Sequence, residues 1–261
     1  MRLPLYQVDA FTARLFGGNP AAICPLENWL PDTLLQSIAA ENNLAETAYF
    51  VKEAEGYRLR WFTPAVEVDL CGHATLAAAH VLFHCLGLVG DTVTFQSRSG
   101  PLTVTRNAAL YTLDFPSRPP LPLPASEPIT AALGRPPQAV LAARDLFCVF
   151  ASEAEVAALK PDMKAVASLP HFAVIVTAPG DHCDFVSRFF APAQGIDEDP
   201  VTGSAHCTLT PYWADRLGKT QMTARQISAR GGDLTVEIAG DRVKMTGQAV
   251  LYLEGFVSVA I

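Results

Sequence analysis

The sequence predicts a strand-rich α+β fold made of two similar lobes, each a strongly curved, mostly antiparallel sheet wrapped round a central helix. Three observations support this prediction. The chain has 261 residues, of which 50% are hydrophobic, which is enough to bury two modest cores. One pattern of motifs occurs twice along the chain, and a proline-rich segment separates the two copies. We therefore expect a duplicated unit, with the active site in a cleft between the lobes.

The internal repeat is the strongest of these observations. "RWFTPA" starts at Arg60 and "RFFAPA" starts at Arg188, an offset of 128 residues. Three residues are then inserted in the second copy, so that Gly72 aligns with Gly203 at an offset of 131. Near-constant offsets over several motifs are hard to obtain by chance, so we interpret the two copies as a duplication.

Each copy contains one helix that is apolar nearly all round. In the first copy it is "ATLAAAHVLFHCLG" (74–87), and in the second it is "SAHCTLTPYWADRLG" (204–218). Both end in Leu-Gly, where the glycine suits a left-handed C-cap. A helix without a polar face has to be covered on all sides, so we expect the strands of each lobe to wrap round its helix.

The remaining predicted elements are shorter. "PDTLLQSIAAENN" (31–43) predicts a helix, because proline suits a first helical turn, and "SEAEVAALK" (152–160) is its counterpart. Alternation of apolar and polar residues predicts short strands in both copies. These strands are "TVTFQS" (92–97), "LTVTR" (102–106), "LYTLDF" (110–115), "QISAR" (226–230), "LTVEIAG" (234–240) and "RVKMTGQ" (242–248).

A proline-rich segment separates the two copies. Six prolines fall within the 13 positions of "PSRPPLPLPASEP" (116–128). Such a segment can neither continue a sheet nor start a helix early, so it predicts a stiff, extended connector. We place the lobes at 1–117 and 118–261, and we allow the last strand to cross to the other lobe.

The composition argues against two classes of partner. The net charge is −7, the pI is near 5.3, and the chain has no run of Lys or Arg, so we expect no nucleic-acid partner. No stretch reaches the roughly 18 consecutive apolar residues of a membrane span. The N-terminus lacks the apolar segment of a secretory signal, and the six cysteines include no C-x-x-C pair. We expect a cytoplasmic protein.

Two junctions between a loop and a helix are candidates for a binding site. "DLCGHAT" (69–75) and "DEDPVTGSAH" (197–206) both pass through a glycine-containing turn into the apolar helix. Helix N-termini offer free N–H donors and a partial positive charge, so two of them facing one cleft would bind a carboxylate. Each junction could equally be an ordinary capped helix start, and the sequence leaves these alternatives even.

Glu46 is a third candidate. It lies in "NNLAETAYF" (42–50), where a helix gives way to an apolar strand. Burial raises the pKa of a carboxyl group and makes that group a candidate proton carrier. The spacing alone favours a simpler interpretation, a solvated glutamate in a turn.

Four motifs together resemble one known family. In chain order they are "GGNPAAIC" (17–24), "NNLAETAYF" (42–50), "RWFTPAVEVDLCGHAT" (60–75) and "GIDEDPVTGSAH" (195–206). The set strongly resembles the PhzF-like isomerase family of phenazine biosynthesis, whose fold is shared with diaminopimelate epimerase. The resemblance implies an isomerase without cofactor or metal that moves a proton between carbons of a small carboxylate-bearing substrate. It also implies a homodimer.

The resemblance implies a set of site residues. Glu46 matches the family's proton-shuttling glutamate, and His73 would orient the substrate or assist proton movement. Asp199 would hold or polarise the substrate, whereas Asp197 and Glu198 would be solvated neighbours. The implied substrate-binding residues are Ser204, Gly72, Gly203, Asn19 and Cys71.

The sequence departs from the epimerases at their two catalytic cysteines. Cys71 stands at the first position, but the second falls at Pro200, and proline cannot carry a proton. This argues against a two-thiol racemase and favours one carboxylate that delivers the proton on one face. Ala45 stands where family members often have a serine, which suggests a substrate different from the phenazine precursor.

Other functions compete with this interpretation. One is an amino-acid epimerase or racemase, and another is a non-catalytic protein that keeps the fold and binds a small molecule. His80 and His84, with Cys85 beside them, have the spacing of a hydrolase metal site but lie in an apolar helix without a glutamate partner. "FGGNP" (16–20) lacks the Gly-Lys-Ser/Thr ending of a phosphate-binding loop.

Overall fold

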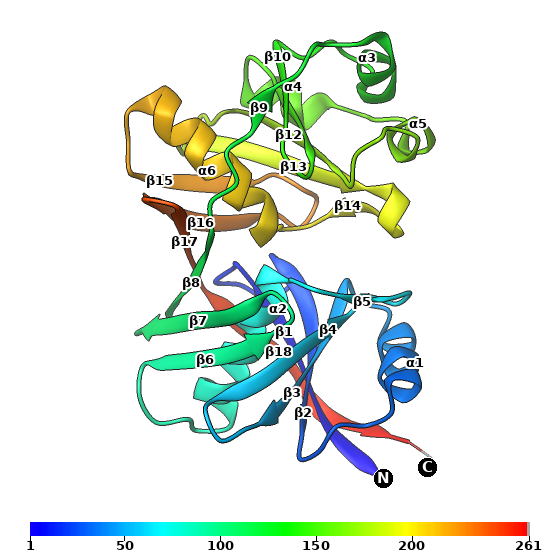
Figure 1. The fold of residues 1–261 in the computed structure, drawn as a ribbon, viewed down its shortest axis with the longest axis vertical. Helices are drawn as coiled ribbons and strands as arrows, with labels where there is room; N and C mark the ends of the chain where they lie inside the picture. Colours follow the sequence, from blue (N-terminus) through cyan, green and yellow to red (C-terminus); the bar gives the residue numbers. More distant parts are fainter. Residues whose placement is uncertain (260–261) are drawn as a thin grey trace. The chain divides into compact units, whose positions relative to one another are not determined.

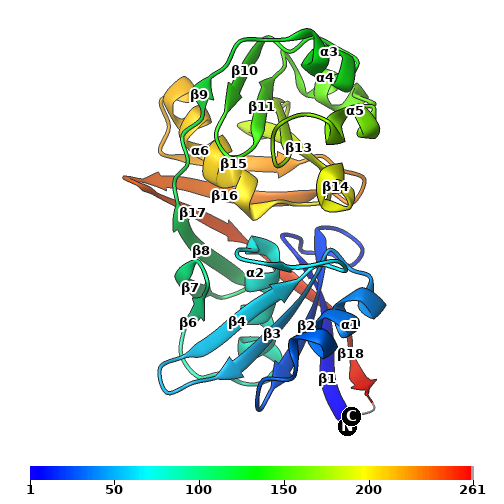
Figure 2. The ribbon, with the colours of Figure 1, turned by 45° about the vertical axis from the view of Figure 1, so that its right-hand side comes forward.

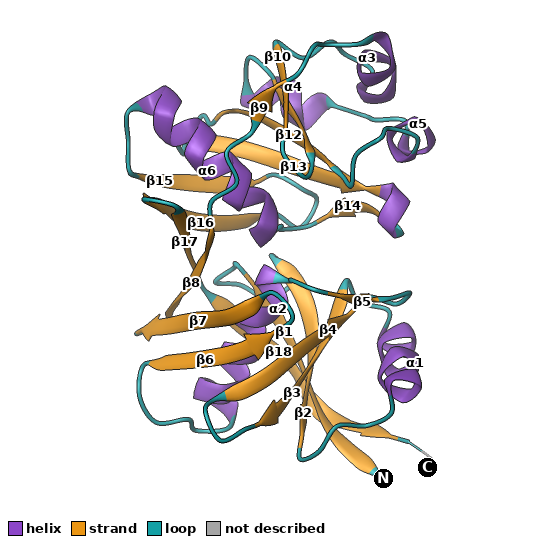
Figure 3. Cartoon of the chain, viewed as in Figure 1, coloured by secondary structure: helices purple, strands orange, loops and turns teal. Residues whose placement is uncertain are grey.

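The computed structural model describes residues 1–259 and divides into two compact units. Unit 1 comprises Met1–Asp114 together with the chain from Thr246, and unit 2 comprises Phe115–Met245. The fold is mixed α/β, with many strands and few long helices (Figure 3).

Unit 1 contains strands at the three stretches predicted for the first copy, 92–97, 102–106 and 110–115. Its elements are β1 (Arg2–Ala10), β2 (Asn19–Leu26), α1 (Asp32–Asn42), β3 (Glu46–Lys52), β4 (Tyr57–Phe62), β5 (Glu67–Val68), α2 (Gly72–His80), the π-helical turn η1 (Val81–Cys85), β6 (Thr92–Ser97), β7 (Gly100–Asn107), β8 (Leu110–Pro116) and β18 (Ala249–Ser258). β8 runs into the start of unit 2.

Unit 2 contains the remaining elements. They are β9 (Leu121–Pro122), α3 (Glu127–Leu133), β10 (Ala139–Ala142), β11 (Leu146–Val149), α4 (Glu153–Ala158), α5 (Met163–Ala167), β12 (Val174–Pro179), β13 (Phe185–Ala191), the 3-10 turn η2 (Pro192–Gln194), β14 (Ile196–Asp199), α6 (Gly203–Leu217), β15 (Gln221–Gln226), β16 (Gly232–Ala239) and β17 (Arg242–Gly247).

The strands of the two units pair in the same order. In unit 1, β1–β2 is antiparallel, β2–β3 parallel, β3–β4 and β4–β5 antiparallel, β4–β6 parallel and β6–β7 antiparallel. In unit 2, β10–β11 is antiparallel, β11–β12 parallel, β12–β13 and β13–β14 antiparallel, β13–β15 parallel and β15–β16 antiparallel. The repeat in the sequence therefore coincides with a repeated strand topology.

The helix α2 is the centre of the core of unit 1. All nine of its residues are buried, and it contacts β1, β2, β3 and β18, lying among the strands of this unit (Figure 1). Ala74 and the three alanines at 77–79 keep the helix thin, so the strands can approach it closely. α1 packs against β3 and β4 (Figure 2). Leu35 and Ile38 of this helix belong to an apolar cluster.

The helix α6 has the corresponding place in unit 2. It contacts β15 and β16, and Trp213 stacks on Phe185 of β13 with ring centroids 5.7 Å apart. The helix runs through Pro211 without ending, and it closes at Gly218 in the left-handed conformation that the Leu-Gly motif predicts.

The C-terminal strand belongs with the N-terminal one. β18 pairs antiparallel with β1 from Arg2↔Ser258 to Ala10↔Ala249, with a bulge between Gln7 and Val8. Tyr6 and Val8 of β1 are buried by this arrangement.

Two predictions about secondary structure were wrong. "QISAR" is not a strand, because β15 ends at Gln226 and the next residues turn, with the Ser228 hydroxyl accepting from the N–H of Gly231 at positive φ. The connector also takes part in a sheet, since β9 pairs with β10 through residues 121 and 122. α3 starts inside the connector at Glu127, because proline at a first-turn position needs no N–H partner. Within residues 1–259, no helix combines the length and apolar character needed to cross a membrane.

Candidate active site

The strand register of unit 1 brings Glu46 to the start of α2. β2 and β3 are parallel, with Ala21 opposite Glu46, so the first residues of both strands lie at the same edge of the sheet. Asn19 is the first residue of β2. Cys71 is the N-cap of α2. Thr75, one helical turn further along, donates its hydroxyl to the Cys71 carbonyl and so stabilises the helix start.

Three predicted residues meet around the ring of a fourth, His73. Its Nε2 lies 3.1 Å from Oε2 of Glu46, and its Nδ1 lies 3.1 Å from Nδ2 of Asn19. The Sγ of Cys71 lies 3.5 Å from the same Nδ1. Asn19 is fully buried and the Glu46 side chain is 13% exposed, so this cluster is largely shielded from solvent.

The hydrogen bond from Asn19 determines where the ring carries its proton. An amide Nδ2–H can only donate, so Nδ1 of His73 accepts from it. A neutral imidazole with an accepting Nδ1 carries its hydrogen on Nε2. That Nε2 lies 3.1 Å from Oε2 of Glu46 as an ion-pair contact, although within residues 1–259 neither atom makes a hydrogen bond of good geometry.

The titration of the neighbouring groups fits a proton-handling cluster. Burial, with a further contribution from the charge of Glu46, raises the pKa of Cys71 to about 11, so Cys71 is a neutral thiol at pH 7. Burial lowers the pKa of His73, but Cys71 and Glu46 outweigh this effect and place it above the ordinary value. The Glu46 carboxylate favours the charged form of His73, whereas the Asn19 amide opposes a proton on Nδ1, so the two contacts act on the protonation of the ring in opposite directions.

The same three side chains could be interpreted as a metal site. Glu46, Cys71 and His73 each offer a ligand atom within 4.8 Å of the others. However, Cys71 contacts Nδ1 and Glu46 contacts Nε2, which lie on different edges of the ring. A single ion bound by all three residues would therefore use only one of the two ring nitrogens.

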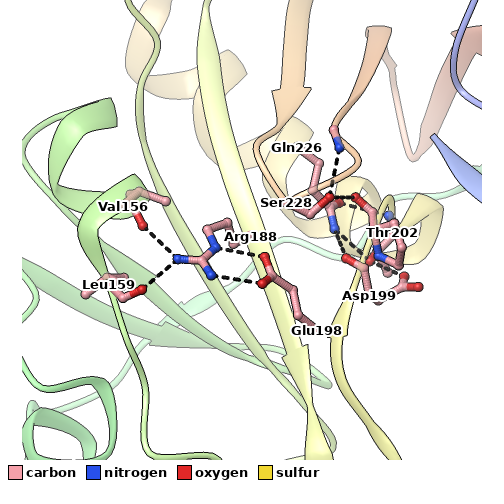
Figure 4. A network of polar contacts seen from close by, with 10 residues as sticks. Val156, Leu159, Arg188, Glu198, Asp199, Thr202, Gln226 and Ser228 are labelled. Carbon is pink, nitrogen blue, oxygen red and sulfur yellow. Dashed lines mark hydrogen bonds and ion pairs between the residues drawn. The ribbon is translucent and has the colours of Figure 1, made fainter. Parts of the chain in front are cut away.

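In unit 2, Asp199 ends β14 and is held by the loop that leads into α6. The Thr202 hydroxyl donates to its carboxylate, and the Gln226 side chain donates to its backbone carbonyl over 2.7 Å (Figure 4). Gln226 also accepts from the N–H of Thr202 at 2.8 Å, and Ser228 donates to the Pro200 carbonyl. Asp199 is 7% exposed, and it lies three residues before Thr202, the N-cap of α6, rather than at the helix start itself.

The two acids beside Asp199 have different environments. Asp197 is exposed, as predicted. Glu198 is not a solvated neighbour, which corrects that prediction, because its two carboxylate oxygens accept from Nε and Nη2 of Arg188 at 2.8 and 2.9 Å (Figure 4). Alternation along β14 turns Glu198 and Asp199 to opposite faces of the strand, so only one of them can face the start of α6.

The helix starts of the two units correspond residue by residue. Cys71 is the N-cap of α2 and Thr202 is the N-cap of α6, at the repeat offset of 131. Pro200, where the resemblance to the epimerases puts their second cysteine, lies two residues before this N-cap. Threonine also cannot act as a thiol base, and the argument against two catalytic thiols therefore holds.

Ser204 has a partner that the sequence motifs did not indicate. Arg144, in the turn between β10 and β11, donates Nη2–H to Oγ of Ser204 over 3.3 Å. Its neighbour Asp145 accepts from Nε and Nη2 of the same guanidinium at 3.0 and 3.1 Å. The Arg-Asp pair belongs to no predicted motif, and its only signal in the sequence is a charged pair directly before the apolar run 146–151.

The competing metal site at His80 gains no support. His80 contacts the Tyr111 hydroxyl through Nδ1 at 3.1 Å and stacks on His84 with ring centroids 4.9 Å apart. Burial, together with the charge of His84, lowers the pKa of His80 to about 4, which fits a neutral ring packed in a core. Among residues 1–259, neither His80 nor His84 belongs to a group of three candidate metal ligands.

Comparison with known proteins gives a consistent assignment. The family model for phenazine biosynthesis-like proteins (PhzC-PhzF) matches residues 8–255. An uncharacterized isomerase of Pseudomonas aeruginosa is 54% identical over 256 residues, covering 98% of both chains. A PhzF-family crystal structure from Enterococcus faecalis is 50% identical with a TM-score of 0.97, covering 99% of this chain and 100% of that one.

A more distant structure shares the fold alone. It is a hydroxyproline epimerase from Agrobacterium vitis, 9% identical with a TM-score of 0.64, covering 98% of this chain and 92% of that one. The fold and the close relatives define the chain as an isomerase. It belongs to the PhzF-like family of phenazine biosynthesis-like proteins.

Proposed function

We propose that the chain moves a proton between two carbons of a small carboxylate-bearing substrate without a cofactor, and that Glu46 takes and returns this proton. The contact between Glu46 and Nε2 of His73 is the observation that carries the proposal. A largely shielded carboxylate 3.1 Å from the ring nitrogen of a buried histidine has the placement that a general base requires.

The reaction has two steps. The Glu46 carboxylate takes a proton from one substrate carbon, and the electrons of that C–H bond move into an adjacent π system. The resulting carboxylic acid then returns the proton to a second carbon on the same face. His73 Nε2–H stabilises the carboxylate form and orients it, because a hydrogen bond to a charged acceptor is stronger than one to a neutral acceptor.

The structure supports one base better than two. At the repeat offset of 128 the counterpart of Glu46 is Val174, the buried first residue of β12. The counterpart of Cys71 is Thr202. A two-base epimerase or racemase would need a proton-carrying group at one of these two positions of unit 2, so an amino-acid epimerase is the weaker alternative.

The other predicted residues have supporting roles in this proposal. Asp199 and Ser204 bind or polarise the substrate, and backbone N–H groups of Gly72 and Gly203 bind its carboxylate. Cytoplasmic location and a homodimeric state are part of the same proposal. Light scattering from the purified protein tests the dimer.

The test of the proposal is Glu46→Gln. Small carboxylic acids are screened in heavy water by NMR for proton shifts or deuterium uptake, first with the wild-type protein. Glu46→Gln keeps the size of the side chain and cannot carry a proton, so turnover should fall by about 10²–10⁴-fold or more. Glu41→Gln, an exposed glutamate of α1, is the matched control and should keep wild-type turnover. Wild-type turnover by Glu46→Gln would refute the shuttle, and a protein that binds acids but never exchanges a proton would be a non-catalytic binder.

A further inference from the structure

Arg144 of unit 2 is held rigidly although it is partly exposed. Its Nε and Nη2 donate to both oxygens of Asp145, whose side chain is only 2% exposed, while 35% of the Arg144 side chain is accessible. Its guanidinium also lies over the ring of Phe172, 4.3 Å from the centroid. A guanidinium fixed on two sides in this way loses little conformational entropy when it binds a ligand.

The contact with Ser204 determines what the serine can do. Arginine has no acceptor, so Oγ of Ser204 must accept the Nη2–H of Arg144. The hydroxyl hydrogen of Ser204 then remains available for another acceptor. Arg144 and Ser204 together form a set of donors, and such a set fits a ligand that offers oxygen acceptors.

The donors of Arg144 are not all used within the protein. Arg188, also in unit 2, donates from Nε and Nη2 to Glu198 and from Nη1 to the carbonyls of Val156 and Leu159. Arg144 uses Nε and Nη2, and within residues 1–259 its Nη1 has no bonding partner. Arg188 is thus a structural arginine, whereas Arg144 keeps a donor for a ligand.

The duplicated topology places Arg144 where unit 1 places a site residue. His73 and Ser204 are each the second residue of the central helix, at the offset of 131. His73 receives a hydrogen bond from Asn19, the first residue of β2. Ser204 receives one from Arg144, which lies just before β11, the corresponding strand of unit 2. In both units this bond makes the receiving side chain a donor toward whatever lies beyond it.

We propose that Arg144 and Ser204 form a subsite that binds a carboxylate group of the substrate, with Nη1 of Arg144 and the Ser204 hydroxyl as donors. That the bound acid is a substrate rests on the proposed function. The existence of the subsite does not, because it is tested by binding without turnover. Arg144 is then a specificity-determining residue, which selects an acid over its neutral amide.

The test compares benzoate with benzamide, which has nearly the same shape and no charge. Both are titrated into the full-length protein, with the Ser204 amide and the arginine Nε–H signals followed by NMR. Benzoate should shift the signals of Ser204 and Arg144, and it should bind more tightly than benzamide. A charge-assisted hydrogen bond is worth about 1.5–3 kcal/mol, which corresponds to about ten- to a hundredfold in affinity.

The variants are chosen so that the fold survives. Removing Arg144 alone would leave the buried Asp145 unpaired, so the main variant is Arg144→Gln with Asp145→Asn, which replaces the ion pair with neutral amides. It should reduce the preference for benzoate at least tenfold. Arg144→Lys keeps the positive charge but lacks the planar guanidinium with its several N–H donors, so it should lose only part of the preference for benzoate. Arg135→Gln removes an exposed cation elsewhere in unit 2 and is the matched control.

The possible results are distinguishable. An unchanged benzoate preference in the double variant, an equal loss in Arg135→Gln, or no shift at Ser204 with the wild-type protein would each overturn the subsite. Because binding is measured without turnover, Glu46→Gln should still bind benzoate through Arg144. A subsite that binds benzoate in a protein without any proton exchange would leave this inference intact and refute the proposed function.

Discussion

Asn19 donates its Nδ2–H to Nδ1 of His73 over 3.1 Å, although the two residues are 54 positions apart in the chain. This bond joins the first residue of β2 to the second residue of α2. It is a positioning contact, because it sets which nitrogen of His73 faces Glu46 with a hydrogen.

The first prediction concerns the tautomer of His73. Long-range ¹H–¹⁵N spectra of the free wild-type protein should show the hydrogen on Nε2. Asn19→Asp supplies an acceptor in place of the donor, so the hydrogen should move to Nδ1 and turnover should fall by about 10²-fold or more. Asn42→Asp changes an amide that donates to Thr47 instead, and its spectrum should keep the wild-type tautomer. An Nδ1–H tautomer in the wild-type protein would contradict the argument.

The second prediction concerns Cys71. Its raised pKa, about 11, means that burial and the charge of Glu46 keep it a thiol at pH 7, and a thiol is a poor base. Cys71→Ser should therefore retain turnover within about tenfold of the wild type. In a time course with iodoacetamide at pH 8, the less buried Cys85 should be modified before Cys71. A loss of about 10³-fold with the fold intact would return the thiol to the mechanism.

The third prediction concerns stability in acid. His206 is fully buried, and burial lowers its pKa to about 4, outweighing the opposing bond between Nδ1 and the Thr202 carbonyl. The unfolded chain binds a proton near pH 6.5, so the free energy of unfolding should fall as the pH drops from 6.5 to 4. The contribution of His206 over this range is about 3 kcal/mol.

The matched pair of variants isolates this effect. His206→Asn can still donate to the Thr202 carbonyl but does not titrate, so its stability should depend less on pH between 4 and 6.5. His182→Asn changes an exposed histidine and should leave the wild-type slope unchanged. Urea unfolding at several pH values measures both, and parallel pH curves for wild type and His206→Asn would contradict the prediction.

The sequence predicts the helices and most strands well, because those signals are local. A buried apolar helix, a glycine C-cap and alternating strands each depend on residues within a few positions. The repeat adds long-range information, and it extends to the side chains. Arg60 pairs with Glu67 in unit 1, and Arg188 pairs with Glu198 in unit 2, both through two hydrogen bonds.

The features that the sequence did not predict depend on contacts between distant positions. Arg144 and Ser204 are 60 residues apart, and only the chain path of β10, β11 and α6 brings them together. The role of Gln226, which fixes the Asp199–Thr202 loop, has the same cause. Glu198 was predicted to be a solvated acid because its partner Arg188 lies on the neighbouring strand. The contact can be predicted only when the pairing of β13 with β14 is known.

The last prediction concerns the Arg–Glu pairs of the repeat. The Arg188 and Glu198 side chains are 13% and 23% exposed, and Arg188 also donates to two carbonyls at the end of α4. Removing one partner of a mostly buried pair leaves the other charge uncompensated, so Arg188→Ala should lower the free energy of unfolding by about 3–5 kcal/mol.

A more exposed pair in unit 1 provides the control. Arg58 and Glu53 are 45% and 36% exposed, so Arg58→Ala should cost only about 0–1 kcal/mol. Arg188→Ala should also lower turnover beyond its effect on stability, because Glu198 directly precedes Asp199 and a change in β14 moves the carboxylate of that residue. Urea unfolding and turnover of both variants measure these effects. If Arg188→Ala cost no more than Arg58→Ala, the pair would be a surface ion pair without structural importance, and its recurrence in the repeat would have no energetic basis.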